Sequence, residues 1–248
     1  YIAEQMEVAD PDAIHHVRIA LRRAVATALG DAMLATYHAM ATPGPYSPDA
    51  ASSGRRSLRN TCLGYLMETN APEIRKLALA QFDTADNMTD SMAALSAIAN
   101  SEMPERADVL DRFYAKWKDE ALVVDKWLAV QSTSRVKTAL ADVKRLLTHP
   151  AFDLRNPNKV RALVSSFCHA NPVHFHAANG SGYAFCAEHV VQLDALNPQV
   201  AARLARAFDR WRKFDETRQT LAKMALEHIR NAKGLSKDTT EVVVRALA

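Results

Sequence analysis

The chain has 248 residues, enough to bury a substantial core either as one large domain or as a run of repeats. Its 31 Lys and Arg residues nearly balance 28 Asp and Glu residues, and a net charge of +3 gives no indication of a nucleic-acid or membrane partner. Three widely spaced cysteines argue against a disulfide framework, so we expect reduced thiols in the cytoplasm. No apolar run approaches the roughly 20 residues needed to span a bilayer.

The first predicted helix starts at Asp10-Pro11, an N-cap followed by proline at the first helical position. Apolar residues then recur at spacings of three and four, which places them on one stripe of the helix. They are Ile14, Val17, Leu21, Val25 and Leu29. The stretch ATPGPYSPDAASSG (41–54) is rich in proline, glycine and small polar residues and is predicted to be a linker.

Further helices are predicted after this linker, most of them separated by Pro, Gly, Asn or Ser. Their ranges are about 55–69, 71–85, 88–101, 105–118, 120–132, 134–148, 157–170, 181–195, 198–211, 213–232 and 236–247. Only 7 glycines occur and few segments alternate with period two, so the composition favours an all-α fold.

About a dozen helices joined by short loops cannot all surround one central core. We therefore predict a single domain over residues 1–248, built as a superhelical solenoid of stacked helix pairs like HEAT or armadillo repeats. No repeat motif is visible in the sequence, so this prediction rests on the number of helices, and a globular helix bundle stays open.

Six potential metal ligands occupy 22 positions around NPVHFHAANGSGY (171–183). They are Cys168, His169, His174, His176, Cys186 and His189. Cys186 and His189 could share a helix face, but the other spacings fit no established zinc motif. We interpret the stretch as a loop and predict no metal site, with a free-standing metal protein as the alternative.

Motifs for hydrolysis are missing from the chain. It has no H-E-x-x-H string, which would place two zinc ligands and a general base on one helix face. It has no G-x-S-x-G elbow either, and His15 and His16 are adjacent and so diverge by about 100° on a helix. We therefore predict no catalytic residue within these 248 positions.

Two similar strings, NPNKVR (156–161) and NPQVAAR (197–203), each open a predicted helix with an Asn cap and a Pro in the first turn. Each then carries an arginine, Arg161 or Arg203, about one and a half turns into the helix. Two such helix starts could form a wall that attracts carboxylates. Ordinary solvated surface arginines are the simpler alternative, as they are for the basic residues throughout 203–233.

Several strings, in the same order along the chain, resemble the C-terminal helical domain of bacterial aminopeptidase N, a zinc metallopeptidase family. They are DNMTD (86–90), DKWLAVQ (125–131), RNPNKVRALV (155–164), HFHAANGSGYAF (174–185), LNPQVAARLARAF (196–208) and GLSKDTTEVVVRALA (234–248). The chain also begins without Met, so we expect it to belong to a longer polypeptide.

The resemblance implies a helical domain that closes over the catalytic cleft of a four-domain enzyme. It implies no cofactor in this chain, zinc in the parent's catalytic domain, and the catalytic and β domains of the same polypeptide as partners. It also implies that Arg161, Gln199 and Arg203 bind the peptide substrate beyond the scissile bond. The expected function is thus that of a non-catalytic cap domain, and the alternative is a HEAT- or armadillo-like scaffold for a protein partner.

Overall fold

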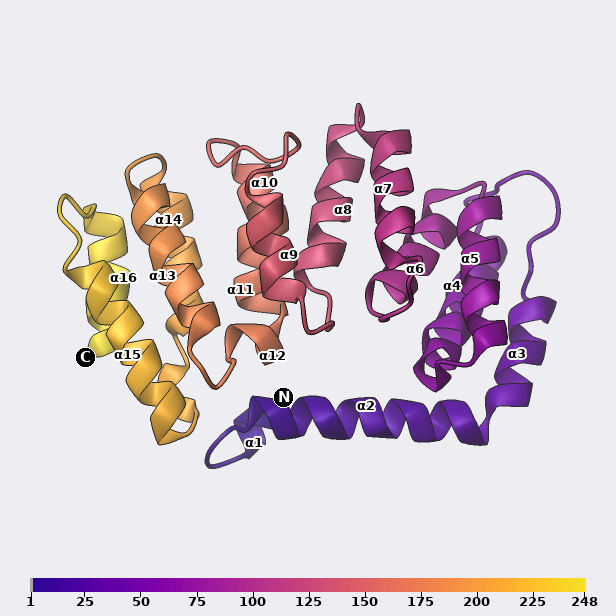
Figure 1. The fold of residues 1–248 in the computed structure, drawn as a ribbon, viewed down its shortest axis with the longest axis horizontal. Coiled ribbons are helices and arrows are strands. Elements are labelled where there is room, and N and C mark those ends of the chain that lie inside the picture. Colours follow the sequence, from indigo (N-terminus) through magenta and orange to yellow (C-terminus); the bar gives the residue numbers. More distant parts are fainter. Residues whose placement is uncertain (1) are drawn as a thin grey trace. The chain divides into compact units, whose positions relative to one another are not determined.

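The computed structural model describes residues 2–248, and all of its regular secondary structure is helical. Among these residues no strand forms, and one isolated backbone bridge joins Ala9 to Phe214. The chain divides into two compact units (Figure 1). Unit 1 combines the first 14 residues with residues 117–248, and unit 2 comprises residues 15–116. The all-α fold predicted from the composition is confirmed.

Unit 2 is built from helix pairs that pack side by side, α3 against α4 and α5 against α6. Its elements are most of α2 (Pro11–Ala28), α3 (Gly30–Ala39), α4 (Ala50–Leu66), the 3₁₀ turn η1 (Met67–Thr69), α5 (Pro72–Thr84), α6 (Met88–Ala99) and α7 (Arg106–Trp117). The sequence prediction did not separate α3 from the helix before it, and α4 begins inside the predicted linker at Ala50, where Asp49 caps it.

A buried amide links four helices of unit 2. Gln81 of α5 donates hydrogen bonds to Asn60 Oδ1 of α4 (2.8 Å) and to the carbonyl of Asp90 in α6 (3.0 Å). It accepts one from the Tyr37 hydroxyl of α3 (2.8 Å). Because Gln81 is 2% exposed, each of these bonds satisfies a polar atom that has no access to water.

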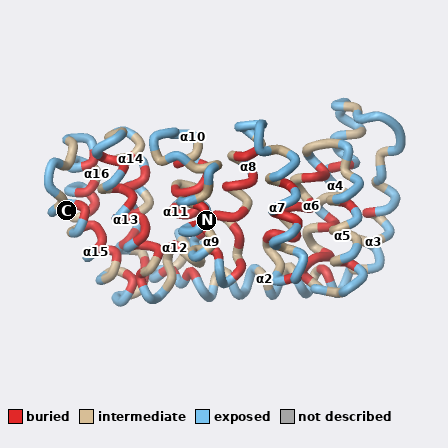
Figure 2. The backbone as a smooth tube through the Cα atoms, turned by 45° about the horizontal axis from the view of Figure 1, so that its top comes forward, coloured by how far each residue is buried: buried red, intermediate tan, exposed pale blue. Residues whose placement is uncertain are grey.

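Unit 1 continues the same pattern, with α13 packed on both α14 and α15 and with α14 on α16. Its elements are α1 (Ile2–Gln5), the start of α2, α8 (Ala121–Ser132), α9 (Ala139–Leu146), α10 (Pro157–Val160), the π-helix η2 (Arg161–Ser165), α11 (Ser166–Ala170), α12 (Pro172–Phe175), α13 (Ser181–Asp194), α14 (Pro198–Ala205), the 3₁₀ turns η3 (Arg206–Phe208) and η4 (Trp211–Lys213), α15 (Glu216–Arg230) and α16 (Lys237–Leu247). Buried residues lie mainly on the helix sides that face neighbouring helices (Figure 2).

The predicted helix 157–170 is interrupted by one π-helical turn. The Ser166 N–H bonds to the carbonyl of Arg161, five residues earlier, and the Ser166 hydroxyl donates to the same oxygen at 3.0 Å. A π turn inserts one residue into the helix and rotates the side chains that follow it. The periodicity of the sequence gives no sign of this local change.

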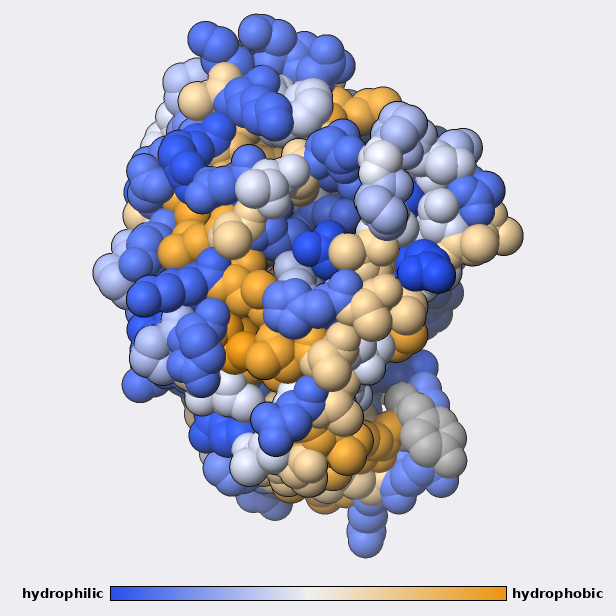
Figure 3. Space-filling view, turned by 90° about the vertical axis from the view of Figure 1, so that its right-hand side faces the viewer, coloured by the Kyte–Doolittle hydropathy of each residue, from blue (hydrophilic) through white to orange (hydrophobic). Residues whose placement is uncertain are grey.

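The apolar stripe predicted on the first helix is only partly buried. Ile14 and Val25 are half-buried, whereas Val17 and Leu21 are each 63% exposed and Leu29 is 52% exposed. Hydrophobic side chains are also visible among hydrophilic ones on the surface of unit 2 (Figure 3). No helix among residues 2–248 is long and apolar enough to cross a bilayer.

Gly182 permits an unusually close approach of α13 to α12. A Cβ atom at this position would lie 2.3 Å from the carbonyl oxygen and 2.6 Å from the Cα of Phe175. Both are backbone atoms, so the contact cannot be relieved by turning a side chain. Only glycine allows the two helices to meet at this distance.

We expect Gly182→Ala to lower the free energy of unfolding by about 2–3 kcal/mol, because the added methyl group forces α12 and α13 apart. Gly54→Ala is the matched control, since Gly54 lies exposed within α4 with no atom within 4 Å of a Cβ. That control should raise the free energy by about 0.5–1 kcal/mol. Urea unfolding of the two variants measures both values, and equal stabilities would contradict the close-approach argument.

Candidate functional site

The three residues that the sequence suggested for substrate binding lie on two segments of unit 1. Arg161 is the first residue of the π-helix η2, and Gln199 and Arg203 are four residues apart on α14, on one face of that helix. All three are exposed. Within residues 2–248, no ion pair or hydrogen bond engages the guanidinium of Arg161 or of Arg203.

The two helix starts that precede these arginines face each other. A cavity of about 270 Å³ lies between them. It is lined by Leu154, Arg155, Pro157 and Val160 on one side and by Leu193, Leu196, Asn197 and Val200 on the other. Asn156 accepts from the Asn158 N–H (3.0 Å) and Asn197 from the Val200 N–H (3.2 Å), so both predicted Asn caps are confirmed.

The sequence did not single out the leucines that line this cavity. Leu154 precedes Asn156 by two residues, and Leu196 directly precedes Asn197. An apolar residue shortly before each Asn-Pro string could therefore have been used to predict that the two helix starts pack together. None of the cavity-lining residues is one of the three predicted substrate residues, which lie further along their helices.

The backbone of Arg203 lies near the helix that follows Arg161. Burial lowers the pKa of His169 in α11, and the Arg203 backbone partly offsets this shift. Arg161 precedes His169 by eight residues, which corresponds to roughly 12 Å along a helix axis. The two arginines are thus carried by separate segments of unit 1.

Most arginines of the basic stretch 203–233 have structural partners. Arg206 pairs with Asp209 (3.2 Å) and Arg210 with Glu4 (2.6 Å). Arg212 and Arg218 also have partners within unit 1. The stretch is therefore not a uniform cationic face.

Arg212 donates to the carbonyls of Ala246 (2.7 Å) and Leu247 (2.9 Å) at the end of α16. Arg218, which is 7% exposed, bonds to Asp12, to Asp215 (2.6 Å) and to the carbonyl of His176 (2.6 Å). These contacts fix the first residues of the chain and α16 against the rest of unit 1.

All 248 residues match the family described as a domain of unknown function, DUF3458_C, with ARM repeats. The chain belongs to this family. It is 40% identical to aminopeptidase N of Escherichia coli (strain K12) over 249 residues, which cover 100% of the chain and 28% of that protein. It is 39% identical to aminopeptidase N of Caulobacter vibrioides over 99% of the chain and 28% of that relative.

Among solved structures, the chain is similar to Legionella pneumophila aminopeptidase A, which was crystallised in complex with aspartic acid. The TM-score is 0.90 at 29% identity, over 99% of the chain and 30% of that structure. The resemblance to the C-terminal helical domain of aminopeptidase N and the expectation of an ARM-like helical repeat are thereby confirmed. The chain spans about 28% of the length of the relatives it matches.

In this member of the DUF3458_C family, the Cys/His cluster of residues 168–189 is divided among several packing contacts. Cys168 and Cys186 are buried and touch each other, and burial, followed by the contact with Cys186, raises the pKa of the Cys168 thiol. His189 bonds to the Phe185 carbonyl at 2.7 Å, while burial lowers the pKa of His169 and the Arg203 backbone partly offsets that shift. Among residues 2–248, no three His, Cys, Asp or Glu side chains converge so that they could hold a metal ion.

His176 is the histidine of this cluster with the most extensive packing. Its ring lies 4.0 Å from that of Phe214, centroid to centroid, and its Nδ1 lies 2.9 Å from the Tyr183 hydroxyl. Burial, and secondarily the positive charge of Arg218, lowers the pKa of His176 to about 4. His176 is therefore neutral at pH 7 and belongs to the core around the loop.

The neutral state of His176 predicts a pH dependence of stability. Between pH 6.5 and about 4 the unfolded chain binds a proton at this position and the folded chain does not, so stability falls as the pH falls through this window. His176 alone should account for about 2–3 kcal/mol of the loss between pH 7 and pH 4.5.

His176→Phe keeps the aromatic packing but cannot bind a proton. In urea unfolding, the free energy of unfolding of this variant should therefore fall less between pH 7 and pH 4.5 than that of the unmodified chain. Burial lowers the pKa of His169 and of His189 as well, so some pH dependence should persist in the variant. If the variant loses as much unfolding free energy between these pH values as the unmodified chain, His176 does not contribute to the pH dependence.

Proposed function

We propose that this chain is the helical cap domain of a zinc-dependent aminopeptidase that releases N-terminal amino acids from peptides. In this proposal it closes the catalytic cavity, restricts access to it and binds the part of the peptide beyond the scissile bond, without being catalytic alone. The match of the entire chain to part of aminopeptidase N carries the proposal. Its partners are the catalytic and β domains of the same polypeptide, and we expect the enzyme to be cytoplasmic.

The substrate contacts are assigned to Arg161, Gln199 and Arg203. The two arginines are exposed on separate segments, and within residues 2–248 their guanidinium groups have no partner. A guanidinium can hold a peptide carboxylate through two parallel hydrogen bonds, and the amide of Gln199 can serve a peptide carbonyl or N–H. Two arginines on separate segments suit an extended peptide, with contacts at more than one residue.

Exposed apolar side chains on α2 favour a cap over a free-standing scaffold. Val17 and Leu21 lie on one stripe of α2, and each is 63% exposed. An apolar stripe of this kind is typical of a surface that meets another protein surface. In this proposal the remaining domains of the same polypeptide cover it.

The zinc of the proposed enzyme belongs to the catalytic domain, outside these 248 residues. The potential ligands of residues 168–189 do not fit a zinc site, because burial raises the pKa of the Cys168 thiol and no three candidate side chains converge within residues 2–248. Zinc supplies the activation of water in such enzymes. This chain's own residues would orient the leaving part of the peptide and exclude bulk water from the cleft.

We expect Arg161→Ala or Arg203→Ala, introduced into the whole polypeptide, to raise KM for tripeptides about 10- to 100-fold. A charge-assisted hydrogen bond contributes about 1.5–3 kcal/mol, and a tenfold change corresponds to 1.4 kcal/mol. KM for a chromogenic amino-acid amide, which has no residue beyond the scissile bond, should change less than twofold. Gln199→Ala should produce a smaller loss on the tripeptide, of about two- to tenfold.

Arg245→Ala provides the matched control, since Arg245 is an exposed arginine on α16, outside the two segments that carry Arg161 and Arg203. It should leave the kinetics with both substrates unchanged. Lysine at 161 or 203 should restore only part of the tripeptide affinity, because it lacks the paired donors of arginine. If KM rose equally for the tripeptide and for the amide, the result would contradict the proposed role of these residues.

A further inference from the structure

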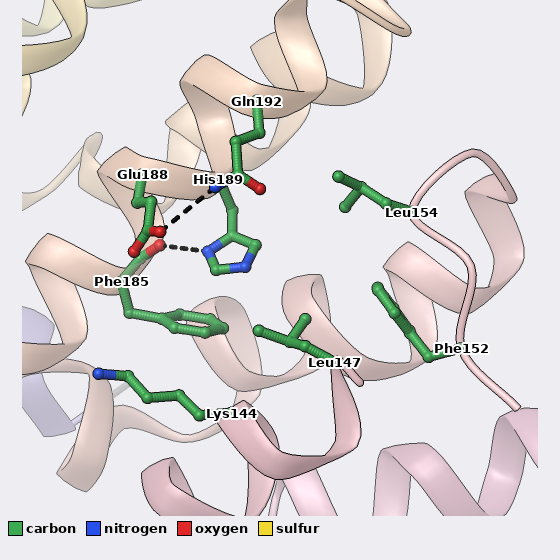
Figure 4. Close-up of a pocket in the computed structure, with 8 residues that line it drawn as sticks. All are labelled: Lys144, Leu147, Phe152, Leu154, Phe185, Glu188, His189 and Gln192. Atoms are coloured by element: carbon green, nitrogen blue, oxygen red, sulfur yellow. Dashed lines mark hydrogen bonds between the residues drawn. The ribbon is translucent and has the colours of Figure 1, made fainter. Parts of the chain in front are cut away.

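A second cavity in unit 1 lies apart from the predicted substrate residues. It has a volume of about 390 Å³ and is formed by the end of α9, the following loop and one face of α13 (Figure 4). Its lining residues are Lys144, Leu147, Phe152, Leu154, Phe185, Glu188, His189 and Gln192. It shares only Leu154 with the cavity between the two helix starts.

A buried histidine presents a free hydrogen-bond acceptor to this cavity. His189 is 4% exposed, and its Nδ1 lies 2.7 Å from the carbonyl oxygen of Phe185. A carbonyl can only accept, so Nδ1 carries the hydrogen and Nε2 carries a lone pair. Nε2 faces the space between Phe185 and Leu147 (Figure 4), and no residue in 2–248 engages it.

The charge state of the ring supports this assignment. Burial lowers the pKa of His189, and the positive charge of Lys144 lowers it further, while the Phe185 carbonyl and Glu188 oppose the shift. The imidazole is therefore neutral near pH 7, and Nε2 remains an acceptor. Nε2 opens to the cavity, where a ligand can reach it, and in apolar surroundings a hydrogen bond donated to it is stronger than in bulk water.

The walls around His189 are apolar, whereas the rim carries both signs of charge. Phe185 lies almost against the imidazole, with ring centroids 4.2 Å apart, and Leu147, Phe152 and Leu154 complete the walls. At the rim, Lys144 has no internal ion pair within residues 2–248. Glu188 accepts one hydrogen bond, from Gln192 at 3.3 Å.

We propose that this cavity binds one free aromatic amino acid whose ring carries a hydrogen-bond donor, as in tryptophan or tyrosine. The ring occupies the apolar walls and donates its N–H or O–H to His189 Nε2. The α-carboxylate pairs with Lys144 and the α-ammonium with Glu188. A cavity of this volume lies at the small end of ligand sites, which suits a single amino acid rather than a longer peptide.

Lys144 and Glu188 carry opposite charges and both line the cavity, which favours a zwitterion. An aromatic amine without a carboxylate would leave Lys144 unused, and an aromatic acid would leave Glu188 unused. This inference does not depend on the proposed aminopeptidase function, because binding is measured on the 248-residue chain without any turnover.

The test is calorimetric titration of the 248-residue chain with L-tryptophan at pH 7.5, in parallel with 1-methyl-L-tryptophan, which lacks the ring N–H. We expect tryptophan to bind at least tenfold more tightly than its methylated analogue. His189→Leu should bind the two ligands equally and with the weaker affinity. His228→Leu, at an exposed position of α15, is the matched control and should retain the full difference.

A second pair of measurements keeps the test decisive if His189→Leu does not fold. Lys144→Met changes an exposed side chain and should weaken tryptophan about tenfold. It should not alter the affinity for L-tryptophanamide, which has no carboxylate. Absence of tryptophan binding at millimolar concentration, or equal affinity for tryptophan and 1-methyltryptophan in the unmodified chain, would overturn the proposal.

Discussion

The contact between Gly182 and the backbone of Phe175 is the constraint on which the arrangement of unit 1 depends. It allows α12 and α13 to approach within a distance that any side chain would prevent. The ring of Phe175 then packs on Tyr183 at 5.3 Å and on Phe208 at 5.8 Å. In this way a single missing methyl group sets the position of α13, the helix that carries Cys186 and His189.

The end of α13 in turn positions α16, the last helix of the chain. Asp194, the last residue of this helix, accepts hydrogen bonds from the Ser236 N–H (2.6 Å), the Ser236 hydroxyl (2.6 Å) and the Thr239 hydroxyl (2.5 Å). Burial by itself would raise the pKa of Asp194, but these bonds outweigh it and lower the pKa. The N-terminus of α16 is thereby held by a carboxylate of another helix, the charge that a helix start favours.

Arginine serves two different purposes in the same stretch of helices. Arg212 and Arg218 donate to backbone carbonyls or carboxylates and so connect segments that are distant in the sequence. Among the residues that the structure describes, 2–248, the guanidinium groups of Arg161 and Arg203 make no such contacts and remain exposed. A guanidinium left free on a surface keeps its donors for a ligand, which is the physical basis for assigning these two to peptide binding.

The sequence by itself determined the all-α class, the Asn-Pro helix starts and the family, because caps, helical spacing and linear strings are local properties. Only the tertiary structure decided which contacts each of several similar histidines makes. His176 and His189 look alike as ligands in the sequence, yet the first lies against the Tyr183 hydroxyl and the second bonds to the Phe185 carbonyl.

The π turn at Arg161 and the cavity beside His189 were equally invisible in the sequence. Each depends on contacts between residues far apart in the chain or on a one-residue shift in hydrogen bonding, and neither alters the apolar periodicity. The apolar stripe of α2 shows the same limit, since spacing placed its residues on one face but could not tell which of them a neighbouring helix covers. Burial is a property of the assembled helices, and only their packing determined it.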